Sequence, residues 1–92
     1  IYEGVDYASV YDYNYYLANY ADLKSAFSNN DNAALQHFVN AGMSEGRQGK
    51  ESFNVYAYMN RYADLRNAFG NNLKNYYLHY MNSGLQEGRV GN

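Results

Sequence analysis

Residues 20–27 read YADLKSAF and residues 62–69 read YADLRNAF, so the chain contains nearly the same eight residues twice, 42 positions apart. Sliding the sequence by 42 positions aligns residues 11–50 with residues 53–92 without a gap. Self-similarity at this period is typical of repeat architectures, in which each unit buries its apolar face against a neighbour. We expect two helical repeats, 11–50 and 53–92, that share one core within a single module (1–92), preceded by a segment at 1–10.

The identical positions are of the kinds that begin, end and pin helices. Equal residues stand at Asp22 and Asp64, at His37 and His79, at Gly42 and Gly84, at Glu45 and Glu87, and at Arg47 and Arg89. We interpret all ten as structural positions of the repeat. The pair Glu3-Gly4 lies 42 positions before Glu45-Gly46. This two-residue match is either a fragment of the repeat's tail or a coincidence.

Apolar residues in each copy follow the spacing of a helix. Tyr13, Tyr16, Leu17 and Tyr20 occupy i, i+3, i+4 and i+7 on one helical face. Asp22 follows where a new helix would start, because a carboxylate there meets free backbone N–H groups and the positive end of the helix dipole. The pattern predicts a kink or a short break at 20–22, with one continuous helix as the alternative.

Each copy closes with a third helix and a glycine-rich exit. The third helix carries Leu35, Phe38 and Val39 in the first copy. We expect it to end at Gly42 in a Schellman motif, with Gly84 in the same role, because glycine takes the left-handed conformation without a Cβ clash. Only residues 5–10 (VDYASV) favour an extended conformation. The predicted fold class is all-α: a compact helical bundle of two pseudo-symmetric three-helix repeats.

Composition excludes several classes of partner. Seven basic and nine acidic residues give a net charge of -2, without a stripe of Lys and Arg, so neither a nucleic-acid surface nor an anionic membrane surface is expected. No run of about 20 apolar residues is present, so we expect no membrane insertion. The chain has no cysteine but 13 tyrosines, which suit contact surfaces as well as small cores. Since the first residue is Ile, we expect a piece of a longer protein, with any targeting segment outside it.

The order Y-[LM]-x-x-Y-A-D-L-[KR]-x-A-F, then H-[FY]-x-N-x-G-[ML]-x-E-G-R, resembles a roughly 40-residue helical repeat of bacterial secreted and surface proteins. Many proteins with such repeats carry N-P-D where this chain has Tyr20-Ala21-Asp22. Tandem pairs of such repeats are found in wall-associated proteins, often beside wall hydrolases. The resemblance covers residues 11–92. It implies a non-catalytic accessory module that binds the cell wall or a glycan, secreted or held on the bacterial surface, without implying a particular ligand.

The sequence indicates neither a catalytic site nor a cofactor or metal site. His37 and His79 are the only histidines and lack the spacing of a zinc site, so we interpret both as structural imidazoles. The Glu-Gly-Arg triplets at 45–47 and 87–89 either bind an anion or a sugar, or pin the exit loop through a charge pair, which we favour. The calcium-loop signature is absent. Paired carboxylates for glycoside hydrolysis are not indicated, because the repeated acids have simpler roles at helix starts and loops.

The repeat divides the tyrosines into two groups. Eight of them match an aromatic or apolar residue in the other copy and are expected in the core: Tyr11, Tyr13, Tyr16, Tyr20, Tyr58, Tyr62, Tyr77 and Tyr80. The other five break the symmetry and are expected to be at least partly exposed. They are the candidate ligand-binding residues: Tyr2, Tyr7, Tyr15 (opposite Ala57), Tyr56 (opposite Asn14) and Tyr76 (opposite Ala34).

Two functions fit this pattern. The first is an extracellular module that anchors a parent protein, with its other domains, to cell-wall peptidoglycan or another polysaccharide through exposed tyrosines. The second is a structural or protein-interaction repeat without a glycan ligand. Exposed aromatic rings beside Asn or Gln side chains would favour the first, and a flat apolar patch would favour the second.

Overall fold

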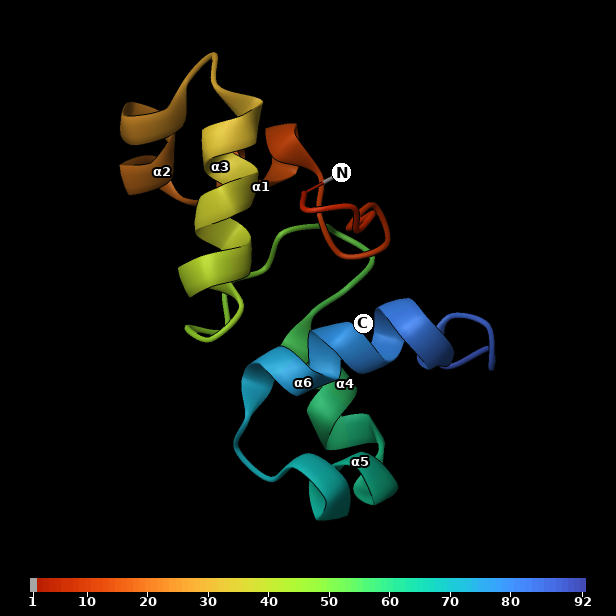
Figure 1. Cartoon of the computed structure of the whole chain (residues 1–92). Coiled ribbons are helices and arrows are strands. Elements are labelled where there is room, and N and C mark those ends of the chain that lie inside the picture. Colours follow the sequence, from red (N-terminus) through yellow and green to blue (C-terminus); the bar gives the residue numbers. More distant parts are fainter. Residues whose placement is uncertain (1) are drawn as a thin grey trace.

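The computed structural model describes residues 2–92, and its regular elements in that range are all helical, which confirms the predicted fold class. Figure 1 shows two groups of three helices joined by an extended connection. Repeat 1 contains α1 (Tyr13–Asn19), α2 (Ala21–Phe27), α3 (Asp31–His37) and the π turn η1 (Phe38–Gly42). Repeat 2 contains α4 (Val55–Arg61), α5 (Ala63–Phe69), α6 (Leu73–His79) and the π turn η2 (Tyr80–Gly84).

The predicted interruption at 20–22 is a true break between two helices. Tyr20 has extended backbone angles (φ -134°, ψ 104°) and separates α1 from α2. Tyr62 does the same between α4 and α5 (φ -119°, ψ 102°). Neither tyrosine side chain caps the helix that follows it. Asp22 and Asp64 lie in the first turns of the second helices, where the dipole favours a carboxylate.

Side-chain caps fix where the first helix of each repeat begins. The Asp12 carboxylate accepts a hydrogen bond from the backbone N–H of Tyr15 at 3.2 Å. In repeat 2, the Asn54 side chain accepts from Tyr56 and Ala57, both at 3.1 Å. Each cap satisfies backbone donors that a helix start would otherwise leave unpaired.

The predicted Schellman motif is wrong in its position. Gly42 is the last residue of the π turn η1, but it has no positive φ, and the backbone stays helical at Met43 (φ -61°, ψ -45°). The left-handed glycine is Gly46, with φ 77°. There Arg47 N–H donates to Gly42 C=O at 2.9 Å and Gly46 N–H donates to Met43 C=O at 3.1 Å. These two bonds form the Schellman motif one turn later than predicted.

The same correction applies to repeat 2 and shows why a glycine is needed at 42 and 84. Gly88 is the left-handed residue there, with φ 76°, and Gly84 is the last residue of η2 without a positive φ. A Cβ on Gly42 would collide with the hydroxyl of Tyr16, and one on Gly84 with the hydroxyl of Tyr58. Both glycines therefore serve close packing rather than chain reversal.

Equivalent backbone bonds close both repeats into loops. Asp12 N–H donates to Gly49 C=O at 2.7 Å, and Asn54 N–H donates to Gly91 C=O at 2.8 Å. The start of each repeat is thus joined to its own end. These closures fall at the repeat boundaries expected from the 42-residue shift.

Tyr77 connects the two repeats through their shared core. Its ring is buried, with centroids 5.6 Å from Phe38 of repeat 1 and 5.3 Å from Phe53. Its hydroxyl donates to the backbone carbonyl of Arg47 at 2.7 Å. The buried apolar cluster consequently contains residues from both repeats. Of the eight tyrosines expected in the core, Tyr16, Tyr58, Tyr77 and Tyr80 are buried, and Tyr11, Tyr13, Tyr20 and Tyr62 pack against the cluster half-buried.

The N-terminal segment has its own local structure. Tyr2 and Val5 exchange backbone hydrogen bonds of 2.9 and 3.0 Å around Glu3 and Gly4, whose φ values are 51° and 80°. Two positive φ values at these positions define a type I′ turn. Glu3-Gly4 therefore does not reproduce the exit loop at Glu45-Gly46. Residues 5–10 form no strand, because Val5 only pairs with Tyr2 and residues 8–10 form a turn.

Gly84→Ala tests the close approach at the π turn. Overpacking a fixed, buried ring costs about 1–3 kcal/mol and outweighs the gain in helix propensity of up to about 1 kcal/mol. We expect a loss of thermal stability of several degrees by circular dichroism. Adding Tyr58→Phe removes the clashing hydroxyl, so the double variant should lose less than the sum of the two single losses. Ser83→Ala is the neighbouring control, and strict additivity of the pair would contradict the packing argument.

Candidate functional site

The Glu-Gly-Arg exit loops are held by the repeated Tyr-Ala-Asp motif. The guanidinium of Arg47 binds both carboxylate oxygens of Asp22, at 3.2 and 3.1 Å, while its Nε donates to Glu45 at 2.8 Å. Arg89 binds Asp64 at 3.1 and 2.8 Å and Glu87 at 2.7 Å in the same way. We call each such set, including the tyrosine below, an arginine clamp.

A tyrosine completes each clamp from the helix break. The guanidinium carbon of Arg47 lies 4.9 Å from the ring centroid of Tyr20, and that of Arg89 lies 4.6 Å from Tyr62. The Tyr20 hydroxyl also accepts the backbone N–H of Gln48 at 2.7 Å, and Tyr62 accepts that of Val90 at 2.7 Å. A cation over an aromatic face is attracted by the ring's quadrupole. The break at Tyr20 and Tyr62 thus turns each ring toward the exit loop.

The clamps are unsuited to binding an anion. Two carboxylates surround each guanidinium, so the cluster of three charged groups is negative overall. All three nitrogens of each guanidinium already bond to carboxylates. Of the two roles considered for the Glu-Gly-Arg triplets, the arrangement therefore fits the charge pair that holds the exit loop in place.

Both histidines bond to core tyrosines. His37 Nδ1 lies 3.0 Å from the Tyr16 hydroxyl, and His79 Nδ1 lies 2.8 Å from that of Tyr58. Burial raises the pKa of both tyrosines, so each hydroxyl keeps its proton and can donate to the imidazole. Across residues 2–92, no three side chains of His, Asp or Glu are grouped so that they could hold a metal ion.

Two of the five asymmetric tyrosines are buried, and their expected exposure is wrong. The Tyr76 ring packs edge-on against Phe69 at 5.3 Å, and its hydroxyl donates to Gly70 C=O at 2.6 Å. It fills space between α6 and the preceding loop, whereas the equivalent Ala34 is itself fully buried in repeat 1. Tyr7 joins the apolar cluster because the N-terminal turns fold it inward, leaving it 8% exposed. An aromatic opposite a small residue thus reflects different local packing as readily as exposure.

Two others take part in contacts within the chain. Tyr56 is 46% exposed, but a Cβ on Gly46 would collide with its ring and hydroxyl, so it covers the exit loop of repeat 1. Tyr2 is half-buried, and its hydroxyl accepts from the Asn40 side chain at 3.5 Å. Neither of these two lines one of the three hollows described below.

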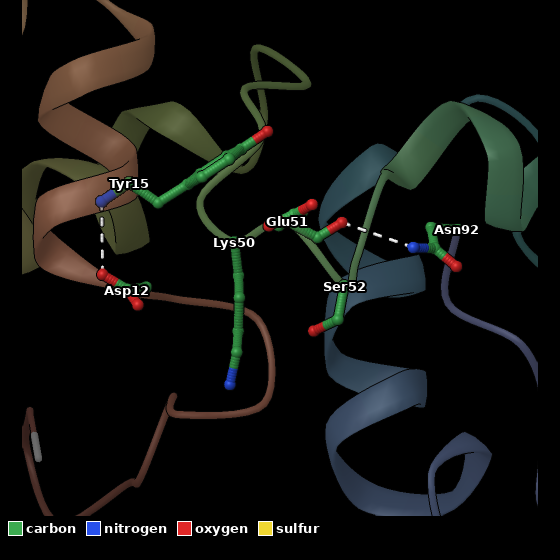
Figure 2. Close-up of a pocket in the computed structure, with 6 residues that line it drawn as sticks. All are labelled: Asp12, Tyr15, Lys50, Glu51, Ser52 and Asn92. Carbon is green, nitrogen blue, oxygen red and sulfur yellow. Dashed lines mark hydrogen bonds between the residues drawn. The ribbon is translucent and has the colours of Figure 1, made fainter.

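Tyr15 alone of the five is partly exposed and also lines a hollow. This hollow has a volume of about 460 Å³, is open to solvent and lies where the start of α1 meets the connection between the repeats. Figure 2 shows the Tyr15 ring on one side and the side chains of the connection on the other. Its lining is completed by Asp12, Lys50, Glu51, Ser52 and Asn92.

Some polar side chains of the Tyr15 hollow are bonded within the chain, and others are free to bind a ligand. Lys50 Nζ donates to Ala8 C=O at 2.7 Å, and the Asn92 amide donates to the backbone carbonyl of Glu51 at 3.4 Å. Among residues 2–92, the Glu51 carboxylate and the Ser52 hydroxyl have no side-chain hydrogen bond. Two carboxylates and one ammonium group leave the lining slightly negative.

Sequence reasoning found Tyr15 but missed the rest of this lining. Glu51 and Ser52 lie between the aligned copies and have no equivalent in the other repeat, so comparing the repeats could not identify them. The remaining members had a usable signal, since Asp12 aligns with Asn54, and Lys50 aligns with Asn92. These are further positions where the two copies differ in charge.

Of two other hollows, one lies between the N-terminal segment and repeat 1, and the other lies in repeat 1. One, of about 260 Å³, is lined in part by Tyr7, Tyr11 and Asp31, and the Tyr11 hydroxyl donates to Asp31 at 3.0 Å. Burial and this neighbouring carboxylate raise the pKa of Tyr11. The other, of about 340 Å³, lies beside Tyr13 and Lys24. Tyr7, Tyr11 and Tyr13 belong to the apolar cluster or pack against it, whereas Tyr15 does neither, so its ring is not committed to the core.

No protein-family model, curated protein or solved structure matches this chain. In residues 2–92, no helix combines the length and apolar character needed to cross a membrane.

The clamps predict how stability depends on pH. Hydrogen bonds from Arg47 and Arg89 hold the pKa of Asp22 and Asp64 below the ordinary value of 3.8. The two ionised carboxylates stabilise the folded state fully above pH 3.8, and this stabilisation is lost as the pH falls through their lowered pKa. We expect Asp22→Asn/Asp64→Asn to melt at a lower temperature at neutral pH and to lose less on acidification than the parent. Parallel melting-temperature curves would contradict this, with Glu51→Gln as the control.

Proposed function

We propose that this chain is a non-catalytic carbohydrate-binding module that anchors a larger parent protein to cell-wall peptidoglycan or another polysaccharide outside the cell. The observation that supports this proposal is the Tyr15 hollow, which combines one accessible aromatic face with uncommitted polar groups. The resemblance of residues 11–92 to repeats of wall-associated proteins points the same way, and it carries the proposed location on the bacterial surface.

The lining matches the two-sided chemistry of a sugar ring. A pyranose presents C–H groups on its faces, which pack on an aromatic ring, and hydroxyl groups around its edge. In the hollow, the Tyr15 ring lies across from the Glu51 carboxylate and the Ser52 hydroxyl, which can accept and donate hydrogen bonds to such an edge. Its volume of about 460 Å³ lies within the usual range for small-ligand sites.

Charge narrows the kind of glycan. Asp12 and Glu51 outweigh Lys50, so sulfated sugars and uronic acids would meet net repulsion. Neutral sugars, acetamido sugars and amino sugars would not be repelled by this lining. The glycan backbone of peptidoglycan carries acetamido groups, whose N–H can donate to the free Glu51 carboxylate.

The site occurs once in each chain. At the sister position, repeat 2 has Ala57 in place of Tyr15 and Asn54 in place of Asp12. The arginine clamps are the same in both repeats, so the difference lies in the side chains and not in the scaffold. We therefore expect one glycan site per chain.

Retention of the chain on purified wall sacculi and on a panel of insoluble polysaccharides tests the proposal. Tyr15→Ala introduces the residue that repeat 2 already carries, so the fold should tolerate it within about 0.5 kcal/mol. Removing the central aromatic contact should weaken retention about tenfold or more, as expected for an interface hot spot.

Tyr56→Ala is the matched control, because it also removes an exposed tyrosine but lies outside the hollow. It should lower the melting temperature, through loss of its packing on Gly46, while leaving retention unchanged. If the parent chain is retained on no glycan, the proposed function is wrong. If it is retained and Tyr15→Ala has no effect, the site is wrong.

A further inference from the structure

The contact between the repeats shows how one unit of this fold docks on the next. Tyr56 covers Gly46 in the exit loop of repeat 1 (residues 44–48), and the Tyr77 hydroxyl donates to the Arg47 carbonyl at 2.7 Å. The Tyr77 ring also packs against Phe38. Repeat 2 thus contributes two tyrosines to a surface of repeat 1 made of a left-handed glycine, a backbone carbonyl and an aromatic ring.

Repeat 2 presents the same surface on its own exit loop (residues 86–90). Gly88 has φ 76° beside 77° at Gly46, and the Arg89–Gly84 backbone bond is 2.9 Å, equal to Arg47–Gly42. The arginine clamp behind the loop is also the same. The backbone that received Tyr56 and Tyr77 in repeat 1 is therefore reproduced.

Nothing within the described chain covers this second surface. A Cβ on Gly88 would have no atom within 4 Å, in contrast with the close approach of Tyr56 at Gly46. Leu85 is 52% exposed and Val90 is 45% exposed, whereas Met43, the equivalent of Leu85, is fully buried. The Arg89 carbonyl accepts no hydrogen bond from any residue in 2–92, although the Arg47 carbonyl does.

We infer that the exit loop of repeat 2, with Leu85 and Val90, is a docking surface for a further helical repeat of this type that carries tyrosines at the positions equivalent to Tyr56 and Tyr77. Those tyrosines would cover Gly88 and donate to the Arg89 carbonyl. The inference continues an interface that the chain already contains, and it does not depend on carbohydrate binding.

Repeat 1 of a second copy does not fit this surface, so the chain cannot polymerise end to end through the same contact. Repeat 1 has Asn14 and Leu35 where repeat 2 has Tyr56 and Tyr77, so it lacks both the ring and the hydroxyl that the surface receives. Tyr7 of the N-terminal segment also lies beside Leu35 along one hollow. Repeat 1 is built as an end repeat and repeat 2 as an interior one, as expected where stacked units need a distinct cap.

A chain lengthened by one repeat tests this directly. A second copy of residues 51–92, appended after Asn92, keeps the 42-residue period and presents tyrosines to the exit loop of repeat 2. Hydrogen exchange of the amides at 86–90 should slow at least tenfold relative to the 92-residue chain, and urea should unfold all three repeats in one transition. In a matched variant, the appended copies of Tyr56 and Tyr77 are changed to Asn and Leu, and the protection should disappear.

Leu85→Asp provides an independent readout. It should lower the urea midpoint of the three-repeat chain clearly while changing that of the 92-residue chain little, because Leu85 is half exposed there. Unchanged exchange at 86–90, or an appended repeat that stays unfolded beside its proposed surface, would overturn the inference. Equal effects of Leu85→Asp on both chains would also overturn it.

Discussion

The contact of Arg47 and Arg89 with the Tyr-Ala-Asp motif is the constraint on which each repeat depends. One guanidinium joins three segments: the aromatic ring at the helix break, the carboxylate in the first turn of the next helix and the glutamate of its own loop. The tyrosine hydroxyl then fixes the backbone just beyond the arginine. Because the clamp spans 25 residues, it brings the end of the third helix back to the junction of the first two. The repeated eight residues thus provide the ring and the carboxylate that hold the exit loop in place.

This closure leaves the repeats free to differ elsewhere, and two sets of these differences bear on the proposed recognition. Tyr15, Asp12 and Lys50 are replaced by Ala57, Asn54 and Asn92, and the first set lines an open hollow. Tyr56 and Tyr77 replace Asn14 and Leu35, and these form the contact between the repeats. The first set supports the proposed glycan site, and the second explains how one repeat stacks on another. Identity between the copies maintains the fold, whereas asymmetry is where recognition is proposed.

Helical spacing was sufficient to predict the all-α class, and Asp22 as a helix start predicted the interruption at 20–22. The match between the two copies predicted the eight tyrosines that lie in the core or pack against it. The position of the Schellman motif was not predictable in this way. Gly42 has the sequence context of a helix end, but its requirement comes from the Tyr16 hydroxyl, which is distant in sequence. Similarly, nothing local distinguishes the buried Tyr76 from the accessible Tyr15, since both lie opposite an alanine. Only the tertiary arrangement shows that Phe69 and Gly70 enclose the former.

The most direct test of the clamp is the NMR behaviour of the arginine side chains in the intact chain. If the clamps form, the Nε–H protons of Arg47 and Arg89 exchange slowly and show nuclear Overhauser contacts to the rings of Tyr20 and Tyr62, respectively. Both signals should change together when Asp22→Asn or Asp64→Asn is introduced in the matching repeat. Rapid exchange with no contact to either ring would contradict the account, because the exit loops would then be held by something other than the repeated motif.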